Sequence, residues 1–356
     1  MEKRITEGKA EAIIHEGKIS KDLPVFYNPA MKLNRDLTIE FLKALDRPMK
    51  ACLPLAGSGI RGIRMLLELD NIDLHMNDGS PEAYQLIKKN LKLNDVKATV
   101  ENKEAAQFMI ENTGFDYIDI DPFGSPNPFL DTAIRRLSRE GILAVTATDT
   151  SALCGTYRKA TRRKYWAESL KNSFMHETGL RILIRKVQLI AAQYERALIP
   201  MLSYSTDHYM RVFFICHKGK QKVDQLDFKY LLYCSACLHR KLSSDNSGAC
   251  NCKEKFSFAG PLYAGPLWDN IVKKMDLGKL EVIKDEMDID TPFYYNIQDI
   301  CKTYGIKHQD KLESIIQKLR DKGHKCSRTH FREQSIRTDA GIKEIAKAIR
   351  PHAGHQ

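Results

Sequence analysis

The residues of this chain best suited to chemistry are residues 119–124, which read Asp-Ile-Asp-Pro-Phe-Gly. They follow an alternating apolar run, 115–118, that predicts a strand. Asp121 and the carbonyl of Pro122 would accept the two N–H hydrogens of an exocyclic amine on a flat base, which favours a nitrogen lone pair directed away from the ring. Phe123 would stack on that base. An ordinary Asp-Pro turn with Phe123 in the core is an equally good interpretation of these residues alone.

A glycine-rich segment lies upstream, at residues 57–62 (Gly-Ser-Gly-Ile-Arg-Gly), between the apolar run 48–56 and a stretch with helical spacing. Glycines let the backbone approach a ligand closely, and a helix N-terminus favours negative charge. Asp78 ends the next expected strand, where a carboxylate can bind both hydroxyls of a ribose. The same pattern occurs in NAD-binding sites. Because an Asp-Pro-aromatic motif ends a later strand here, the order favours S-adenosylmethionine (SAM).

Composition narrows the class of protein. The 356 residues are 43% hydrophobic and 28% charged, which is typical of a globular chain long enough for two domains. The formal net charge of +11 favours a polyanionic partner, with charge for solubility as the alternative. No run approaches the ~20 apolar residues of a membrane span, and the first nine residues do not resemble a signal peptide. Nine cysteines without a secretion signal indicate a reducing, cytoplasmic location.

The elements that must position these motifs alternate along the chain, which predicts an α/β fold. We expect a hairpin within residues 3–19 and a helix over 31–45. Beyond them, strands are expected at 50–55, 72–77, 97–101, 115–120, 141–147 and 210–217, and helices at 60–69, 81–93, 104–111, 126–138 and 176–195. Such alternation predicts a parallel sheet covered on both faces, with ligands bound beyond the carboxyl ends of its strands.

Residues 150–172 form a polar, basic segment in which Tyr157, Tyr165 and Trp166 are interleaved with cations. Basic and aromatic side chains together suit phosphate contacts and base stacking. A solvated amphipathic helix is the alternative. The cations are Arg158, Lys159, Arg162, Arg163, Lys164 and Lys171.

A basic stretch at 217–222 predicts a linker between a first domain, residues 1–220, and a second, residues 221–356. The second domain carries a Cys-x-x-Cys and a Cys-x-Cys motif within about 20 residues, which indicates a closed, structural, tetrahedral Zn²⁺ site. Free cysteines are the alternative. The four thiols are those of Cys234, Cys237, Cys250 and Cys252.

The last part of the chain, residues 291–350, predicts the order helix, helix, ribbon, helix, as in a winged-helix-like module. Its ribbon is basic. We expect phosphate contacts from Lys325, Arg328, Arg332 and Arg337.

Taken together, these segments resemble the tRNA guanine-26 N2-dimethyltransferases in their archaeal form. The similarity covers most of the chain, in order. The matching blocks are 25–29, 34–36, 57–64, 77–78, 119–126, 147–150, 153–157, 208–212 and 260–268.

The resemblance implies a Rossmann-like SAM-dependent methyltransferase domain and a smaller α+β C-terminal domain, which here carries the four-cysteine zinc-type motif. It implies one or two methyl transfers from SAM to the N2 amino group of one guanine in tRNA. We expect a monomer that has tRNA as its partner and does not associate with membranes.

The resemblance also implies roles for individual residues. The SAM contacts would come from Arg35, Gly57, Gly59, Arg61, Asp78, Glu104 and Ala105, with Asp78 on the ribose and Glu104 and Ala105 beside the adenine. The catalytic group would be Asp121, supported by Pro122 and Phe123. Phe26 and Phe123 would hold the guanine. The other expected tRNA contacts are those of Asn28 and, from the basic segment, Arg158, Arg162 and Arg163. Without the resemblance, Arg35 is as readily a surface helix residue and Glu104 a helix N-terminal charge.

One departure concerns the methionine end of the donor. Many SAM-binding domains carry an acid about four residues before the first loop glycine, and Leu53 stands there in this chain. Three rival functions stay open: an amino-methyltransferase for adenine or guanine in DNA or rRNA, an NAD-dependent enzyme, and a tRNA-binding protein without catalysis.

Overall fold

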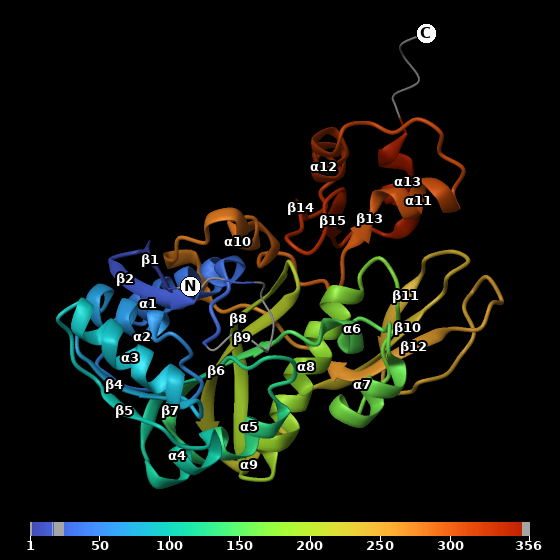
Figure 1. Cartoon of the computed structure of the whole chain (residues 1–356). Coiled ribbons are helices and arrows are strands. Elements are labelled where there is room, and N and C mark those ends of the chain that lie inside the picture. Colours follow the sequence, from blue (N-terminus) through green and yellow to red (C-terminus); the bar gives the residue numbers. More distant parts are fainter. Residues whose placement is uncertain (1, 16, 18–24, 351–356) are drawn as a thin grey trace.

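A seven-stranded sheet forms the centre of the computed structural model, which describes residues 2–15, 17 and 25–350 (Figure 1). The strand order is β5-β4-β3-β6-β7-β9-β8. The bounds are β3 Met49–Leu53, β4 Ile72–Asn77, β5 Thr99–Glu101, β6 Phe115–Ile120, β7 Leu137–Ala147, β8 Arg196–Thr206 and β9 Tyr209–Lys218.

The prediction of an all-parallel sheet is wrong at one edge. Strands β3 to β7 pair in parallel, but β9 is antiparallel to β7, and β8 is antiparallel to β9. The physical reason is the short turn between Thr206 and Tyr209, because a hairpin turn joins antiparallel neighbours and cannot make a parallel crossover. Strand β8 tolerates Pro200 because it is the edge strand and the ladder is irregular there.

Helices cover both faces of the sheet. On one face lie α1 Lys32–Leu45, α2 Ile60–Glu68 and α3 Pro81–Leu93, and on the other lie α4 Ala105–Glu111, α5 Asn127–Arg136 and α8 Met175–Ala192 (Figure 1). Alternate residues of β7 divide between the two cores: Ile142 and Ala144 pack with α1 and α2, and Leu143 and Val145 pack with α5 and α8. This period of two is what a strand buried on both faces requires.

The expected N-terminal hairpin is confirmed as β1 Glu2–Glu7 and β2 Ala10–His15. Its second strand lies against α3, and two asparagines, one in that helix and one at its C-cap, satisfy its open backbone edge. The Ile13 N–H donates to Asn90 Oδ1 at 2.7 Å, and the Glu11 N–H donates to Asn94 Oδ1 at 2.9 Å. The part of the expected hairpin at 16 and 18–19 lies outside the described residues.

A second, smaller sheet follows the main one, in the order β11-β10-β12. Its strands are β10 Phe228–Tyr233, β11 Arg240–Ser243 and β12 Ser257–Tyr263. Leu231 and Leu262 of this sheet belong to the same apolar core as Leu183 of α8. Packing is therefore continuous across the expected domain boundary at residue 220, and that division stays a prediction.

The C-terminal module has the predicted order of helix, helix, ribbon and helix, with one additional short strand. Its elements are β13 Tyr295–Asn296, α11 Ile297–Thr303, α12 Leu312–Arg320, β14 Cys326–Arg328, β15 Ser335–Thr338 and α13 Ile342–Ile349. It has its own core, in which Ile300, Ile315 and Ile345 are buried. Among the described residues, no helix has the length and apolarity needed to cross a membrane.

The remaining helices are short. They are η1 Pro29–Met31, α6 Thr150–Leu153, α7 Arg158–Tyr165, α9 Lys220–Asp224, η2 Asn270–Lys274, η3 Gly278–Leu280 and α10 Ile283–Glu286. Of these, α6 and α7 occupy the basic segment, and η2 to α10 join the small sheet to the C-terminal module (Figure 1).

Candidate active site

A cavity of about 690 Å³ lies at the carboxyl ends of β3, β4 and β6. Ligands of parallel α/β sheets bind at this edge, because the loops that leave it converge there. The cavity, called the candidate site below, is lined by the loops after these strands, by residues 25–28 and by the start of α5.

The glycine-rich loop leads from β3 into α2 and forms one wall. Gly59 caps the helix with φ +78°, a left-handed conformation that side-chain-bearing residues rarely adopt. Gly62, one turn on, packs α2 against the sheet, because a Cβ there would lie 2.4 Å from Met76 Sδ. Gly62 thus keeps α2 close to the sheet, and Gly59 lets the chain turn into the N-terminus of α2, which favours a negatively charged ligand group.

Asp78 lies directly after β4 and holds the loop in place. Its Oδ2 accepts the Gly57 N–H at 2.8 Å, and its Oδ1 accepts the Ser80 N–H at 3.0 Å. Each carboxylate oxygen accepts more than one hydrogen bond, so both keep capacity for the hydroxyls of a ribose. The position of Asp78 in the cavity wall fits the predicted ribose contact.

Asp121 and Phe123 follow β6 and face the same cavity. The Phe123 ring is 48% exposed, which excludes the alternative that placed it in the core. Phe26 meets it with ring centroids 4.0 Å apart and planes inclined by 66°. Since the rings are inclined, a bound base can lie parallel to one of them and meet the other at its edge. The predicted pair is thus brought together beside the predicted carboxylate.

The loop that carries these residues is anchored to the end of β7. The Gly124 N–H donates to Thr148 Oγ1 at 2.7 Å, and the Thr148 N–H donates to the Gly124 carbonyl at 2.9 Å. The loop is therefore fixed by reciprocal hydrogen bonds, which preorganises Asp121 and Phe123.

Arg61 of α2 connects Asp121 to the protein interior. Its Nη2 pairs with Asp121 Oδ2, while its Nη1 donates to Asn34 Oδ1 at 2.9 Å and to Thr38 Oγ1 at 2.8 Å. The same Nη1 lies 3.3 Å from Asp119 Oδ2. Arg61 was expected to contact SAM. It lines the cavity, and its guanidinium also has an acidic partner that the sequence did not suggest.

Beneath Arg61 lies a fully buried ion pair. Arg211 of β9 donates to both oxygens of Asp119, at 2.6 and 2.8 Å, and to Thr146 Oγ1 at 2.9 Å. Burial alone would raise the pKa of Asp119, but the charges of Arg211 and Arg61 outweigh it and lower this pKa to about 2. The same ion pair, together with Arg61 and Asp121, forms what we call the site network.

No role was predicted from the sequence for Asp119 or Arg211. A signal for both was present: each is a charged residue inside an apolar strand, where a charge must be paired. Ser125, Thr148 and His208 also line the cavity and were not predicted. No local pattern marks them, because they meet through the folding of distant segments.

Arg35 lines the cavity from α1, as predicted, but it is held from behind. Its Nε and Nη2 donate to the two carboxylate oxygens of Glu7, each at 2.7 Å, and Nη2 also donates to the Asn28 carbonyl at 3.3 Å. At 6% exposure, Arg35 is not a surface helix residue. Burial opposes ionisation of Glu7, but its bonds to Arg35 and Arg64 lower its pKa.

Asn28 is buried and orders the segment before α1. Its Oδ1 accepts the Ala30 N–H at 2.9 Å and so caps the short helix η1. The residue lines the cavity, and its expected contact with the substrate stays a prediction.

Glu104 and Ala105 lie beyond the cavity wall. The Glu104 carboxylate accepts the Ala106 and Gln107 N–H groups and so caps α4, as its alternative interpretation proposed. Both residues lie near the loop of Asp78, because Asn102 Nδ2 donates to the Asp78 carbonyl at 2.7 Å. Their contact with an adenine stays a prediction.

The basic segment presents cations at the surface beside its aromatic residues. Arg158 and Arg162 each donate to the carboxylate of Glu168, at 2.9 and 2.6 Å, and Arg163 is exposed. Tyr157 is 63% exposed, which suits a stacking role. Tyr165 is buried and cannot stack on a base.

The four cysteines of the predicted zinc site converge at the small sheet. Their sulfurs all lie within 4.8 Å of one another, with Cys234 and Cys252 at 3.4 Å and Cys237 and Cys250 at 3.5 Å. A tetrahedral Zn²⁺ with bonds of about 2.3 Å requires sulfurs about 3.8 Å apart. The set therefore fits a closed structural metal site, and four thiolates leave no position open for chemistry.

Arg337 corrects one expectation in the C-terminal module. It was expected to contact phosphates, but its side chain is 1% exposed and pairs with Glu177 at 2.7 Å and with Glu286 at 3.0 Å. Glu286 also accepts two hydrogen bonds from His330. Burial opposes ionisation of Glu286, but His330 and Arg337 lower its pKa to about 2. We call this set the junction network, because Glu177 belongs to α8.

Three comparisons with known proteins bear on the whole chain. Residues 3–350 match the family model described as N2,N2-dimethylguanosine tRNA methyltransferase. The chain is 38% identical to the tRNA (guanine(26)-N(2)/guanine(27)-N(2))-dimethyltransferase of Aquifex aeolicus, over 97% of this chain and 95% of that protein. It is 38% identical to the tRNA (guanine(26)-N(2))-dimethyltransferase of Thermococcus kodakarensis, over 97% and 98%.

A solved structure resembles the whole fold. The complex of Trm1 from Pyrococcus horikoshii with S-adenosyl-L-methionine superposes with a TM-score of 0.87 at 34% identity, covering 98% of this chain and 100% of that one. Together with the geometry of the candidate site, this confirms the α/β fold class and the methyltransferase type of the main domain.

Proposed function

Since the chain belongs to the N2,N2-dimethylguanosine tRNA methyltransferase family, we propose that it transfers methyl groups from SAM to N2 of a guanine, position 26, in tRNA. The observation that carries this proposal is one cavity in which Asp121 and the exposed Phe123 face the glycine-rich loop and Asp78. That cavity combines groups for a nucleoside donor with groups for a planar amine.

The mechanism follows from the positions of these side chains. SAM, when bound, supplies a methyl group on a positively charged sulfur. Phe26 and Phe123 hold the guanine after it leaves its stack. Asp121 accepts an N–H of the amino group, orients the nitrogen for in-line attack and takes up its proton. Arg61 holds one oxygen of Asp121 and keeps the carboxylate aimed into the cavity.

Removal of a proton from N2 in each cycle lets the same nitrogen react again, so we propose both mono- and dimethylated products. A second transfer requires space for the first methyl group beside the Phe123 ring. We further propose that Asp78 binds the donor ribose, that Arg35 and Arg61 contact the methionine end, and that Glu104 and Ala105 contact the adenine.

We propose that the four cysteines hold Zn²⁺ and keep the turns of the small sheet together. This sheet shares its core with α8, so the metal would stabilise the surface beside the basic segment. There Arg158, Arg162 and Arg163 would contact tRNA phosphates. The described residues of one chain complete the candidate site, so we propose a monomer, acting in the cytoplasm without membrane association.

The test is nucleoside mass analysis of a tRNA transcript incubated with the protein and SAM. We expect N2-methylguanosine followed by N2,N2-dimethylguanosine at position 26. A matched transcript with adenine at position 26 and guanine at position 27 tests whether this chain also methylates position 27, the second position in the name of the A. aeolicus relative. Methylation of duplex DNA or rRNA instead of tRNA would contradict the proposal.

Binding of the donor is tested separately by thermal unfolding. SAM should raise the unfolding temperature, and NAD should not. Stabilisation by NAD alone would support the dehydrogenase alternative, while tRNA binding without methyl transfer would support the non-catalytic one.

A further inference from the structure

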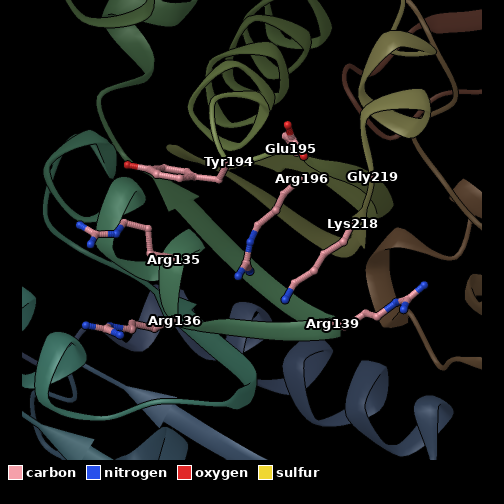
Figure 2. A pocket seen from close by; sticks show the side chains of 8 residues that line it. All are labelled: Arg135, Arg136, Arg139, Tyr194, Glu195, Arg196, Lys218 and Gly219. Atoms are coloured by element: carbon pink, nitrogen blue, oxygen red, sulfur yellow. The ribbon is translucent and has the colours of Figure 1, made fainter.

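A second cavity, of about 670 Å³, lies outside the candidate site and is lined mainly by cations. It is called the basic pocket below. Figure 2 shows Arg196 and Lys218 extending toward one hollow, while the side chains of Arg135 and Arg136 extend outward on one side of it and that of Arg139 on the other. These cations come from segments far apart in sequence, around residues 135–139, 196 and 218, which the fold brings together.

The positive charge of the basic pocket is poorly neutralised. Of the lining residues, Glu195 is the acid, and it already pairs with Lys220 at 3.5 Å. Arg135 lies 3.8 Å from Asp131. Within 2–15, 17 and 25–350, no carboxylate is in ion-pair contact with Arg136, Arg139 or Lys218. A cluster of cations that repel one another is costly unless an anion occupies the space between them.

Hydrogen bonding indicates which cations are free to bind. Arg196 Nη1 donates to the Leu137 carbonyl at 2.7 Å, which fixes the side chain in the wall of the pocket. The Nε of Arg136 is buried and has no hydrogen-bond partner. Arg135, Arg139 and Lys218 are exposed at the rim. Guanidinium and ammonium groups arranged in this way are suited to phosphate oxygens.

The position of the basic pocket relates it to the candidate site. Strand β9 starts beside His208, which lines the candidate site, and ends at Lys218. Helix α5 likewise begins near Phe129 and ends at Arg136. At ~3.3 Å per strand residue and ~1.5 Å per helix residue, β9 spans roughly 33 Å and this part of α5 roughly 10 Å, so the two cavities lie roughly 10–33 Å apart.

We propose that the basic pocket binds backbone phosphates of the tRNA at a distance from the guanine in the candidate site. The proposal rests on the proposed function. A tRNA displays phosphates continuously over such distances, since a double-stranded RNA-binding module contacts about 16 base pairs at once. The pocket carries no apolar ring for stacking except Tyr194, so it contributes affinity and orientation and does not read sequence.

The test removes three exposed cations together, Arg135→Ala, Arg139→Ala and Lys218→Ala. The matched control removes three exposed lysines from and beside α3, by Lys88→Ala, Lys92→Ala and Lys97→Ala, with the same change in net charge. Binding of full-length tRNA is measured as a function of salt for both variants. A thermal unfolding curve of each confirms that it is folded.

We expect the pocket variant to bind tRNA about tenfold more weakly, with a salt dependence shallower by about 2 to 3 units of log K per log salt. The KM for tRNA should rise, and kcat at saturating tRNA should stay unchanged. The control variant should lose less than half of that slope. A short RNA hairpin with the target guanine should bind wild type and pocket variant equally.

Several results would overturn the inference: an unchanged salt slope in the pocket variant, an equal loss in the control, or an equal loss for the short hairpin. An experiment with pyrophosphate distinguishes the two possible ligands of the pocket, tRNA and a small anion. If pyrophosphate stabilises the wild type but not the pocket variant, while tRNA affinity is unchanged, the pocket is a site for a free phosphate compound. If the wild type transfers no methyl group to any tRNA, the proposed function fails, and this inference falls with it.

Discussion

The site network and the junction network both consist of arginines paired with carboxylates, but only the site network reaches a cavity. In the junction network, Arg337, Glu177 and Glu286 are each at most 1% exposed, and every charge faces another charge. In the site network, Asp119 and Arg211 are equally buried, but Asp121 at its end is 20% exposed in the cavity. The fully buried junction network, the closed set, can only hold segments together. Asp121, the open end of the site network, can contact a substrate.

This difference predicts that the open end controls rate and the closed set controls stability. Removing one partner of a fully buried pair leaves an uncompensated charge. Removing Asp121 leaves Arg61 with Asn34, Thr38 and Asp119 as partners. The four experiments below test that separation.

The largest effect is expected from Asp121→Ala. It removes the acceptor of the amino proton, so kcat should fall about 10²- to 10⁴-fold. Affinity for SAM and the unfolding temperature should change little. Single-turnover methyl transfer and calorimetric SAM binding measure the two. Asp73→Ala is the control, because Asp73 is an exposed acid at the end of β4 that lies away from the candidate site. Near-normal turnover of Asp121→Ala would show that the proton acceptor is another group.

Arg337→Met tests the closed set. The change leaves Glu177 and Glu286 buried with one partner fewer, and the free energy of unfolding should fall by about 3–5 kcal/mol. The kcat of the folded variant should remain close to that of the wild type. Urea unfolding and initial rates measure both, with Lys343→Met, at an exposed position of α13, as control. A loss of activity without a loss of stability would contradict the assignment of a purely structural role to the junction network.

The third experiment concerns pH. The pKa of Glu286 falls from 4.5 to about 2 on folding, so the folded state releases this proton more readily than the unfolded state does. Its contribution, of order 3 kcal/mol, is complete above pH ~4.5 and is lost as the pH falls toward 2. Glu286→Gln should be less stable near neutral pH and lose less stability between pH 5 and 2.5. Parallel stability curves for variant and wild type would disprove this.

The smallest effect is expected from Phe123→Ala. Loss of one stacking ring costs about 1–3 kcal/mol, so kcat/KM for tRNA should fall roughly 10- to 100-fold, with SAM affinity unchanged. Ile110→Ala is a matched control, because Ile110 is also 48% exposed and lies on α4. Equal losses in both variants would remove the assigned role of Phe123.

Local pattern was sufficient to predict several elements. Strands β4 and β6 were predicted with the bounds that the structure shows, because apolar residues alternate with polar ones in both and each strand is followed directly by an acid. The approach of Asp78 to Asp121 followed from the same logic, since the carboxyl ends of parallel strands meet at one edge.

The features that sequence could not supply depend on partners distant in the chain. Strand β8 was not predicted from the sequence, because Pro200 and the hairpin turn that follows resemble a loop locally. Arg337 was expected at the surface, because nothing near it in sequence indicates that Glu177 lies against it. The pairing of Arg61 with Asp121 joins residues of different strand-loop units, and no spacing rule predicts it.

The burial of Glu177 on α8 has a consequence for how such chains can diverge. Because the carboxylate that secures the C-terminal module belongs to a helix of the main sheet, neither part can be exchanged alone. A hybrid protein with the C-terminal module of another protein would keep Glu177 buried without its arginine partner from this module. Lineages that modify the recognition module must therefore change α8 in step with it, and grafting experiments should transfer both together.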